Sequence, residues 1–406
     1  MNIARQIILD HEIRYSLPLG NIDCDFEWVD GFLFCAPEHS VDLLDDELAA
    51  SHRAGLNGVE KVARAPVDSF NTGPALRFPR QAQFHPLKYL AGLARCIERD
   101  GGRICTGSHV DEVQDGDRPR VKVGDHTITA RAVVVATNAS ISDYVVTHAK
   151  QEPYRTFVIG ARVPKGAVPA ILLWDTPDPY HYVRIQPMAD HDVLIVGGED
   201  HKTGHQDDGD ERLQHLEDWT RVRFPMVQSI DYRWSGQVVE PVDYMSFTGV
   251  TPGGQNVYMH SGDSGNGITH GIMAGILLTD LILGRQNPWA ELYKPTRVSL
   301  RSAPTLIKHN VEAALDFANY VLPADDIEGI QPDEGRVISR HGKRIAAYRD
   351  AEGMLHERSA VCTHLKCIVE WNSTEKSWDC PCHGSRFDPH GKVLNGPAIA
   401  PLAEPE

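Results

Sequence analysis

The sequence has 406 residues, which exceeds the usual size of one domain, so two or more domains are expected. Its composition, 41% hydrophobic and 24% charged residues, is that of an ordinary globular protein. The formal net charge of −16 argues against nonspecific binding to nucleic acid or to an anionic membrane. The longest apolar stretch, Gly271–Leu283, is too short to span a bilayer. No basic, apolar leader opens the sequence, so a cytoplasmic protein is expected.

The first hundred residues predict a strand and two longer helices. Apolar residues between Cys24 and Phe34 are typical of a strand, and Val41–Leu56 has the spacing of an acidic amphipathic helix. Pro86 suits the first turn of the second helix. The apolar face of that helix is expected to hold Leu87, Leu90, Leu93 and Ala94, and a shorter helical pattern is formed by Ile3, Ile7 and Ile8.

Short strands are expected from Arg103 onward, ending in the β-branched run Ala132–Asn138. A run of this kind is typical of a strand buried on both faces of a parallel sheet. Residues 150–235 alternate apolar and polar side chains, which predicts an antiparallel sheet. Val193–Gly198 belongs to that sheet rather than to a nucleotide-binding turn, because no helix start follows it. On one strand face lie Tyr180, Tyr182 and Arg184, which could either hold a carboxylate or be solvated.

A glycine-rich turn follows in Val257–Gly271 and leads into an apolar helix predicted over Ile272–Leu283. A strand, such a turn and a helix N-terminus together favour an anion site, since backbone N–H groups and the positive end of the helix dipole converge there. A tight turn without a ligand is the alternative. Beyond it, Arg297–Leu322 predicts a linker passing into a helix, and small antiparallel strands are expected from about Gly335.

Two loops near the C-terminus each offer one thiol and one imidazole in addition to a spare cysteine. They read Cys362-x-His364-x-x-Cys367 and Cys380-x-Cys382-His383. Two cysteines on one iron and two histidines on the other are what a two-iron Rieske cluster needs. A tetrahedral zinc site takes the same four ligands, but it leaves the remaining cysteine of each loop without a role.

These loops, with Gly396-Pro397 after them, resemble those of the Rieske proteins. The resemblance implies a [2Fe-2S] cluster held by Cys362, His364, Cys380 and His383. Cys367 and Cys382 would then lock the loops together as a disulfide. A Rieske oxygenase is disfavoured, because no later site of two histidines and one carboxylate for iron is found.

The preceding part resembles the D-amino acid and glycine oxidase superfamily, through the run ending at Asn138, the turn after Val257, and the segments Trp234–Asp243 and Pro288-Trp289. The resemblance implies FAD bound beside Val110, Ala136, Thr137, Gly262, Asp263, Ser264, Gly265, Asn266, Gly267 and Ile268. The G-x-G-x-x-G turn that usually opens this family is absent, so the sequence is expected to enter the family pattern late. A misassigned start and a natural truncation are the two explanations.

The expected fold is an α/β (α+β) flavoprotein fold lacking its first βαβ unit, followed by a small all-β Rieske domain. The expected limits are 1–296 for the FAD-dependent part, with an antiparallel substrate sheet at about 150–235, then 297–326 for a linker and 327–406 for the Rieske domain. The resemblance implies an oxidoreductase that oxidises a small amine or amino acid with FAD and passes single electrons through the cluster to an unidentified protein. The alternative is an electron-transfer module on a catalytically incompetent scaffold.

Overall fold

The computed structural model describes residues 22–141, 145–298 and 329–405. These residues form two compact units. The first comprises residues up to Thr106 with Thr156–Asp200 and Asp210–Gly236, and the second comprises Gly107–Arg155, His201–Gly209 and Gln237–Glu406. The predicted N-terminal helical pattern and most of the predicted linker and helix lie outside the described residues. The expected domain limits stay a prediction.

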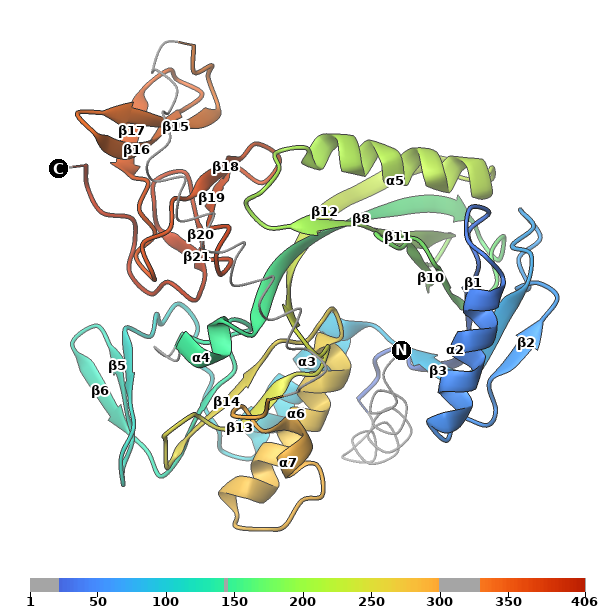
Figure 1. Cartoon of the computed structure of the whole chain (residues 1–406), viewed down its shortest axis with the longest axis horizontal. Coiled ribbons are helices and arrows are strands. Elements are labelled where there is room, and N and C mark those ends of the chain that lie inside the picture. Colours follow the sequence, from blue (N-terminus) through green and yellow to red (C-terminus); the bar gives the residue numbers. More distant parts are fainter. Residues whose placement is uncertain (1–21, 142–144, 299–328, 406) are drawn as a thin grey trace. The chain divides into compact units, whose positions relative to one another are not determined.

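The first unit is built on an eight-stranded sheet (Figure 1). The unit limits fall within β8, β11 and β12, so one end of each of these strands belongs to the second unit. β10 pairs antiparallel with both β9 and β11, whereas β1 pairs parallel with β9. Residues 150–235 therefore supply much of the sheet, as their alternating pattern predicted. In spatial order the strands are β12 (Ser229–Pro241), β8 (Gln151–Pro164), β11 (His191–Lys202), β10 (Tyr182–Pro187), β9 (Leu172–Asp175), β1 (Glu27–Phe34), β3 (Ala75–Gln83) and β2 (Glu60–Val62).

Helix α5 (Gly209–Arg223) covers one face of this sheet (Figure 1). Its Leu213 and Leu216 join a buried apolar core with strand residues such as Ile159 and Leu194. A second core forms where Leu44 of α2 (Asp42–Arg53) packs against apolar residues of β1 and β3. Apolar burial on both helices thus holds the sheet in place.

Helix α3 (Pro86–Arg99) begins where predicted, and the His85 side chain accepts a hydrogen bond from the Lys88 N–H at its start. The predicted apolar face is wrong, because Leu87 is 71% exposed and Leu90 is also exposed. The helix instead buries the face that carries Tyr89 and Gly92. A Cβ on Gly92 would collide with Ile22, so a glycine is what allows this close packing.

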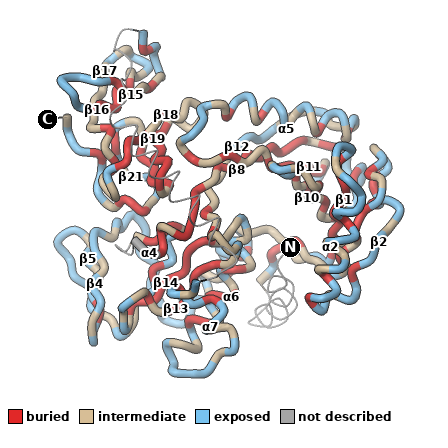
Figure 2. The backbone as a smooth tube through the Cα atoms, viewed as in Figure 1, coloured by how far each residue is buried: buried red, intermediate tan, exposed pale blue. Residues whose placement is uncertain are grey.

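The second unit contains a three-stranded sheet in the order β13 (Phe247–Val250), β14 (Val257–Ser261) and β7 (Val133–Val135). β7 and β14 are parallel, and every residue of β14 is buried (Figure 2). β7 was expected to be buried on both faces, but Val134 is 43% exposed. β7 is an edge strand of the described sheet, so one of its faces is open. The remaining elements here are β4 (Glu112–Gln114), β5 (Arg120–Val123), β6 (His126–Thr129), α4 (Val145–His148), α6 (Gly267–Ile282) and α7 (Ala290–Tyr293).

The C-terminal part of the second unit is all β, as predicted. Its apolar core gathers four cysteines of the two C-terminal loops around Trp378 and Phe387, both fully buried. One sheet consists of β15 (Glu334–Arg340), β16 (Lys343–Arg349) and β17 (Leu355–Ser359), and the other of β18 (Glu370–Asn372), β19 (Ser377–Asp379), β20 (Arg386–Phe387) and β21 (Val393–Asn395). Among the described residues no helix has the length and apolar character needed to cross a membrane.

The packing of α5 on the sheet predicts that Leu216→Ala destabilises the first unit. Leu216 is fully buried, so its truncation should lower the free energy of unfolding by about 2–5 kcal/mol. Val222→Ala is the control on the same helix, because Val222 is 77% exposed and should change it little. Urea unfolding followed by tryptophan fluorescence measures both, and equal effects of the two variants would contradict the packing.

Candidate functional site

Two loops of the second unit, residues 362–367 and 380–385, have the same backbone geometry, and we call them the cluster loops. In the first, the Cys362 N–H donates to Cys367 O at 2.8 Å and the Lys366 N–H donates to Cys362 O at 3.1 Å. The second loop repeats both bonds at equivalent positions, from Cys380 N to Ser385 O at 2.8 Å and from Gly384 N to Cys380 O at 3.0 Å. The fifth residue of each loop is left-handed, with φ +68° at Lys366 and φ +76° at Gly384.

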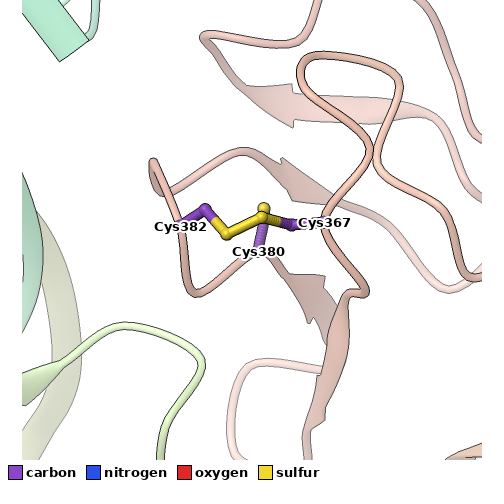
Figure 3. A group of neighbouring side chains, drawn as sticks. All are labelled: Cys367, Cys380 and Cys382. Atoms are coloured by element: carbon purple, nitrogen blue, oxygen red, sulfur yellow. A yellow bond between two sulfur atoms is a disulfide. The ribbon is translucent and has the colours of Figure 1, made fainter. Parts of the chain in front are cut away.

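A disulfide joins the two cluster loops. It links Cys367 to Cys382, as the resemblance implied, and their Cα atoms lie 6.4 Å apart. The Sγ atom of Cys380 lies within 4.8 Å of both disulfide sulfurs (Figure 3). The crosslink therefore holds the beginning of the second loop against the end of the first.

The other two cysteines of these loops are free, buried thiols, Cys362 and Cys380. They hydrogen-bond to each other, which lowers the pKa of Cys362 to about 7 and raises the pKa of Cys380 well above its usual value. The Ser385 side chain also hydrogen-bonds to Cys362 and lowers its pKa further. One thiolate is thus readily formed, and a bound cation would be needed to draw the proton from the second.

His364 and His383 lie side by side, with ring centroids 5.1 Å apart. Burial lowers the pKa of His364 to about 3 and that of His383 to about 4, with further lowering by neighbouring charges. Both rings are therefore neutral near pH 7, the state in which an imidazole nitrogen can bind a metal. The Nδ1 atom of His383 is buried and has no hydrogen-bond partner among the described residues. Two neutral imidazoles and two adjacent thiols on matched loops fit a two-iron cluster.

The glycine-rich turn lies between β14 and α6 in the same unit. Gly262 and Gly265 have φ +79° and +73°, values that glycine adopts without strain. α6 begins at Gly267, five residues earlier than predicted, and the Asn266 side chain donates to Ser264 O at 2.7 Å at its start. The Ser261 hydroxyl donates to Asn138 O at 2.6 Å, so the turn and the end of β7 lie together.

Several residues predicted to bind FAD are exposed to solvent around the glycine-rich turn. Ala136 and Thr137 are exposed beside β7, and Gly265, Gly267 and Ile268 are exposed at the helix start. The backbone N–H groups of a first helical turn lack partners within the helix, so this surface suits the ring system of a flavin. Val110 lies just before β4, and its role stays a prediction.

Sequence reasoning missed the side chains that surround the turn. His260 Nε2 lies 2.9 Å from Asp263 Oδ1, and His270 Nδ1 lies 3.1 Å from Asp263 O. Gln151, on the first residue of β8, packs against Gly262 and lies 3.2 Å from the Ser261 hydroxyl. The histidine spacing around the turn was visible in the sequence, whereas the position of Gln151 depends on chain pairing that no local pattern reveals.

In the first unit, Tyr182 and Arg184 of β10 point away from the core that contains Val183 and Ile185, as predicted. The Tyr180 and Tyr182 rings lie 6.0 Å apart. Arg184 is half-buried, which lowers its pKa, and it donates to Phe84 O and Gln186 Oε1, each at 3.2 Å. It forms no ion pair with any described carboxylate, and its Nε has no hydrogen-bond partner among the described residues.

Cluster loops on an all-β C-terminal part, and a strand, turn and helix of flavoprotein type before them, define a flavoprotein oxidoreductase joined to a Rieske domain. The chain belongs to the FAD dependent oxidoreductase family, whose model matches residues 7–281, and the Rieske [2Fe-2S] domain model matches residues 319–406. The cofactors of these two families are FAD and a [2Fe-2S] cluster, as predicted.

The chain is similar over nearly its whole length to YhfW of Bacillus subtilis (strain 168), a protein named as a Rieske 2Fe-2S iron-sulfur protein. The two are 32% identical over 409 residues, which cover 99% of this chain and 79% of that protein. A stretch of 131 residues, 31% of this chain, is 33% identical to the cytochrome b6-f complex iron-sulfur subunit of Synechococcus sp. (strain WH7803) and covers 69% of it.

Two solved structures share the fold of the flavoprotein part. Glycine oxidase from Geobacillus kaustophilus is 17% identical with a TM-score of 0.61, and L-proline dehydrogenase from P. horikoshii is 16% identical with a TM-score of 0.57. Each match covers 73% of this chain and 82% of the other. The fold class expected from the sequence is thereby confirmed.

The ligand assignment predicts that His383→Ala abolishes the cluster. The variant should lose the visible absorbance and the reduced-state paramagnetic signal, because one iron would lack a ligand. His390→Ala, which alters an exposed histidine of the same domain, is the control and should keep both. An unchanged spectrum with about two irons per chain in the His383 variant would contradict the assignment.

The hydrogen bond from Ser385 to Cys362 predicts that Ser385→Ala lowers the midpoint potential of the cluster. Hydrogen bonds to cluster sulfurs stabilise the more negative, reduced state, so their loss favours oxidation. Phe387→Tyr would add a second hydroxyl in the same core and should raise the potential. A redox titration measures both shifts, with Ser359→Ala, outside the cluster loops, as the control. An unchanged midpoint in both variants would show that these hydroxyl positions do not act on the cluster.

Proposed function

We propose that the chain oxidises a small amine or amino acid at FAD and passes the electrons singly through its Rieske cluster to an acceptor protein. The observation that carries this proposal is that one compact unit holds both the cluster loops and the exposed turn before α6. Two cofactors in one unit favour coupled electron transfer over two independent activities. When bound, FAD accepts a hydride and the cluster carries one electron at a time.

Each group of residues has a role in this proposal. The N-terminus of α6 stabilises negative charge beside it through its dipole and its unpaired N–H groups. Cys362, Cys380, His364 and His383 hold the cluster, and burial keeps both imidazoles neutral and so able to bind iron. The disulfide between Cys367 and Cys382 keeps the two loops at the spacing that the cluster requires.

The proposed substrate class rests on Arg184. A half-buried guanidinium without a carboxylate partner among the described residues is costly unless a ligand supplies the anion. A planar guanidinium binds a carboxylate through two parallel hydrogen bonds, which suits an amino acid better than a simple amine. Glycine oxidase and L-proline dehydrogenase share only the fold with this chain. The proposal that the substrate carries a carboxylate therefore depends on Arg184 alone.

A test uses the full-length chain loaded with FAD and iron–sulfur cluster. Anaerobic addition of an amino acid such as glycine or proline should bleach the yellow flavin absorbance and then produce the paramagnetic signal of the reduced cluster. A chain that holds its cluster but carries no flavin, or whose flavin is never bleached by any small amine or amino acid, would instead be an electron-transfer module.

The Arg184 assignment predicts that Arg184→Gln raises the KM for an amino acid substrate about 10- to 100-fold, the equivalent of about 1.4–2.7 kcal/mol. Arg162→Gln is the matched control, because Arg162 already pairs with Asp231 at 2.8 Å. Arg184→Lys should restore only part of the affinity, since a lysine cannot form the bidentate pair. A KM that is the same for Arg184→Gln and for the control would remove Arg184 from the site.

A further inference from the structure

The histidines of the cluster loops are only partly exposed and pack against another part of the second unit. The ring of His148, on α4, lies 4.7 Å from that of His364 and 5.6 Å from that of His383, between ring centroids. His148 is only 4% exposed. We call His364 and His383, with the flanking Pro381 and Gly384, the histidine edge.

The surface opposite this edge approaches it so closely that glycine is needed on both sides. A Cβ on Gly204 would lie 2.8 Å from Pro381 N, and a Cβ on Gly384 would lie 2.6 Å from Pro153 Cβ. The Gln237 side chain also donates to Gly384 O at 2.8 Å. Backbone-to-backbone approach of this kind requires a fixed arrangement of the two surfaces. We call His148, Pro153, Gly204 and Gln237 the docking surface.

Polar contacts flank the docking surface. The guanidinium of Arg155, which is 1% exposed, lies 3.2 Å from Glu375 Oε1. Asp207 Oδ1 accepts hydrogen bonds from the Ser373 backbone N–H at 2.6 Å and from its hydroxyl at 2.8 Å. Arg155 is buried and Glu375 is partly exposed, and removing the partner of a buried charge is costly, so these contacts favour a single docked arrangement.

The docking surface also leads directly to the turn before α6. His148 is three residues from Gln151, so their Cα atoms lie at most about 11 Å apart. Gln151 contacts Ser261 and Gly262 at that turn. One short segment therefore touches the histidine edge at one end and the candidate flavin turn at the other.

We propose that the docking surface is the electron-transfer contact of the cluster, so that the cluster receives its electrons from the flavoprotein part of the same chain through His148 and the histidine edge. This inference rests on the proposed function and names the internal partner of the cluster. With both cofactors bound, a reduced flavin would hold two electrons and the oxidised cluster would accept one. Two successive transfers, each followed by delivery to an external one-electron acceptor protein, would return both cofactors to their oxidised states, and the flavin protons would leave to solvent.

The first test asks whether the histidine edge is covered in the cluster-loaded, full-length protein. Gly204→Val should push the docking surface away from Pro381, because the added side chain would collide with the Pro381 backbone. Gly253→Val is the matched control, because Gly253 has the same φ of +75° and no atom within 4 Å of an added Cβ. The readout is the relaxation of the reduced cluster's paramagnetic signal by soluble dysprosium–EDTA.

Wild type and Gly253→Val should show equally weak relaxation, and Gly204→Val should show a several-fold stronger effect. His148→Ala should also strengthen relaxation, because it removes a side chain that covers the histidine edge. This variant leaves the left-handed glycine unchanged, so it replaces Gly204→Val in the test if that variant does not retain its cluster. Wild-type relaxation as strong as that of the opened variants would show a solvent-facing histidine edge and would overturn the proposal.

The second test measures transfer in protein that carries both cofactors. After photoreduction of the flavin, cluster reduction should be at least about tenfold slower in Gly204→Val, which corresponds to 1.4 kcal/mol, and unchanged in Gly253→Val. Equal rates in both variants would reject the docking surface and leave the proposed function intact. No transfer in the wild type, with both cofactors bound, would reject the proposed function itself.

Discussion

The matched hydrogen bonds that shape the two cluster loops are the constraint on which the rest of the second unit depends. In each loop a cysteine N–H closes the turn onto the residue five positions later, and this places one thiol and one imidazole on each side of a shared centre. The mutual hydrogen bond of Cys362 and Cys380 exists only because the loops meet. The disulfide and the apolar core around Trp378 hold them there.

Burial gives these groups their chemistry. It keeps His364 and His383 neutral, and part of that burial comes from His148, which lies in a segment more than 200 residues earlier in the sequence. The same segment reaches Gly262 through Gln151. The cluster loops and the turn before α6 thus belong to one packed region. Because this region is tightly packed, a side chain added at Gly204 should displace the histidine edge.

The sequence was most informative where chemistry is local. Cysteine and histidine spacing predicted the cluster loops, the resemblance to Rieske proteins implied the disulfide, and alternation predicted the strands from β8 to β12. Patterns failed where burial depends on distant neighbours: Leu87 and Leu90 have helical spacing, yet α3 packs through Gly92. Val134 looks like an interior strand residue, yet β7 is an edge. No local sequence pattern predicts a role for His148, because that role depends on its contacts with the rings of His364 and His383.

The ring closed by the disulfide spans a sequence separation of 15 residues and contains the first half of the second cluster loop. Closing a ring of about this size removes about 3 kcal/mol of freedom from the unfolded chain. This crosslink does not involve Cys362, Cys380 or either histidine, so it survives when iron and sulfide are lost. We expect a chain that has lost its cluster to keep the empty loops aligned, in an arrangement that could take up iron and sulfide again.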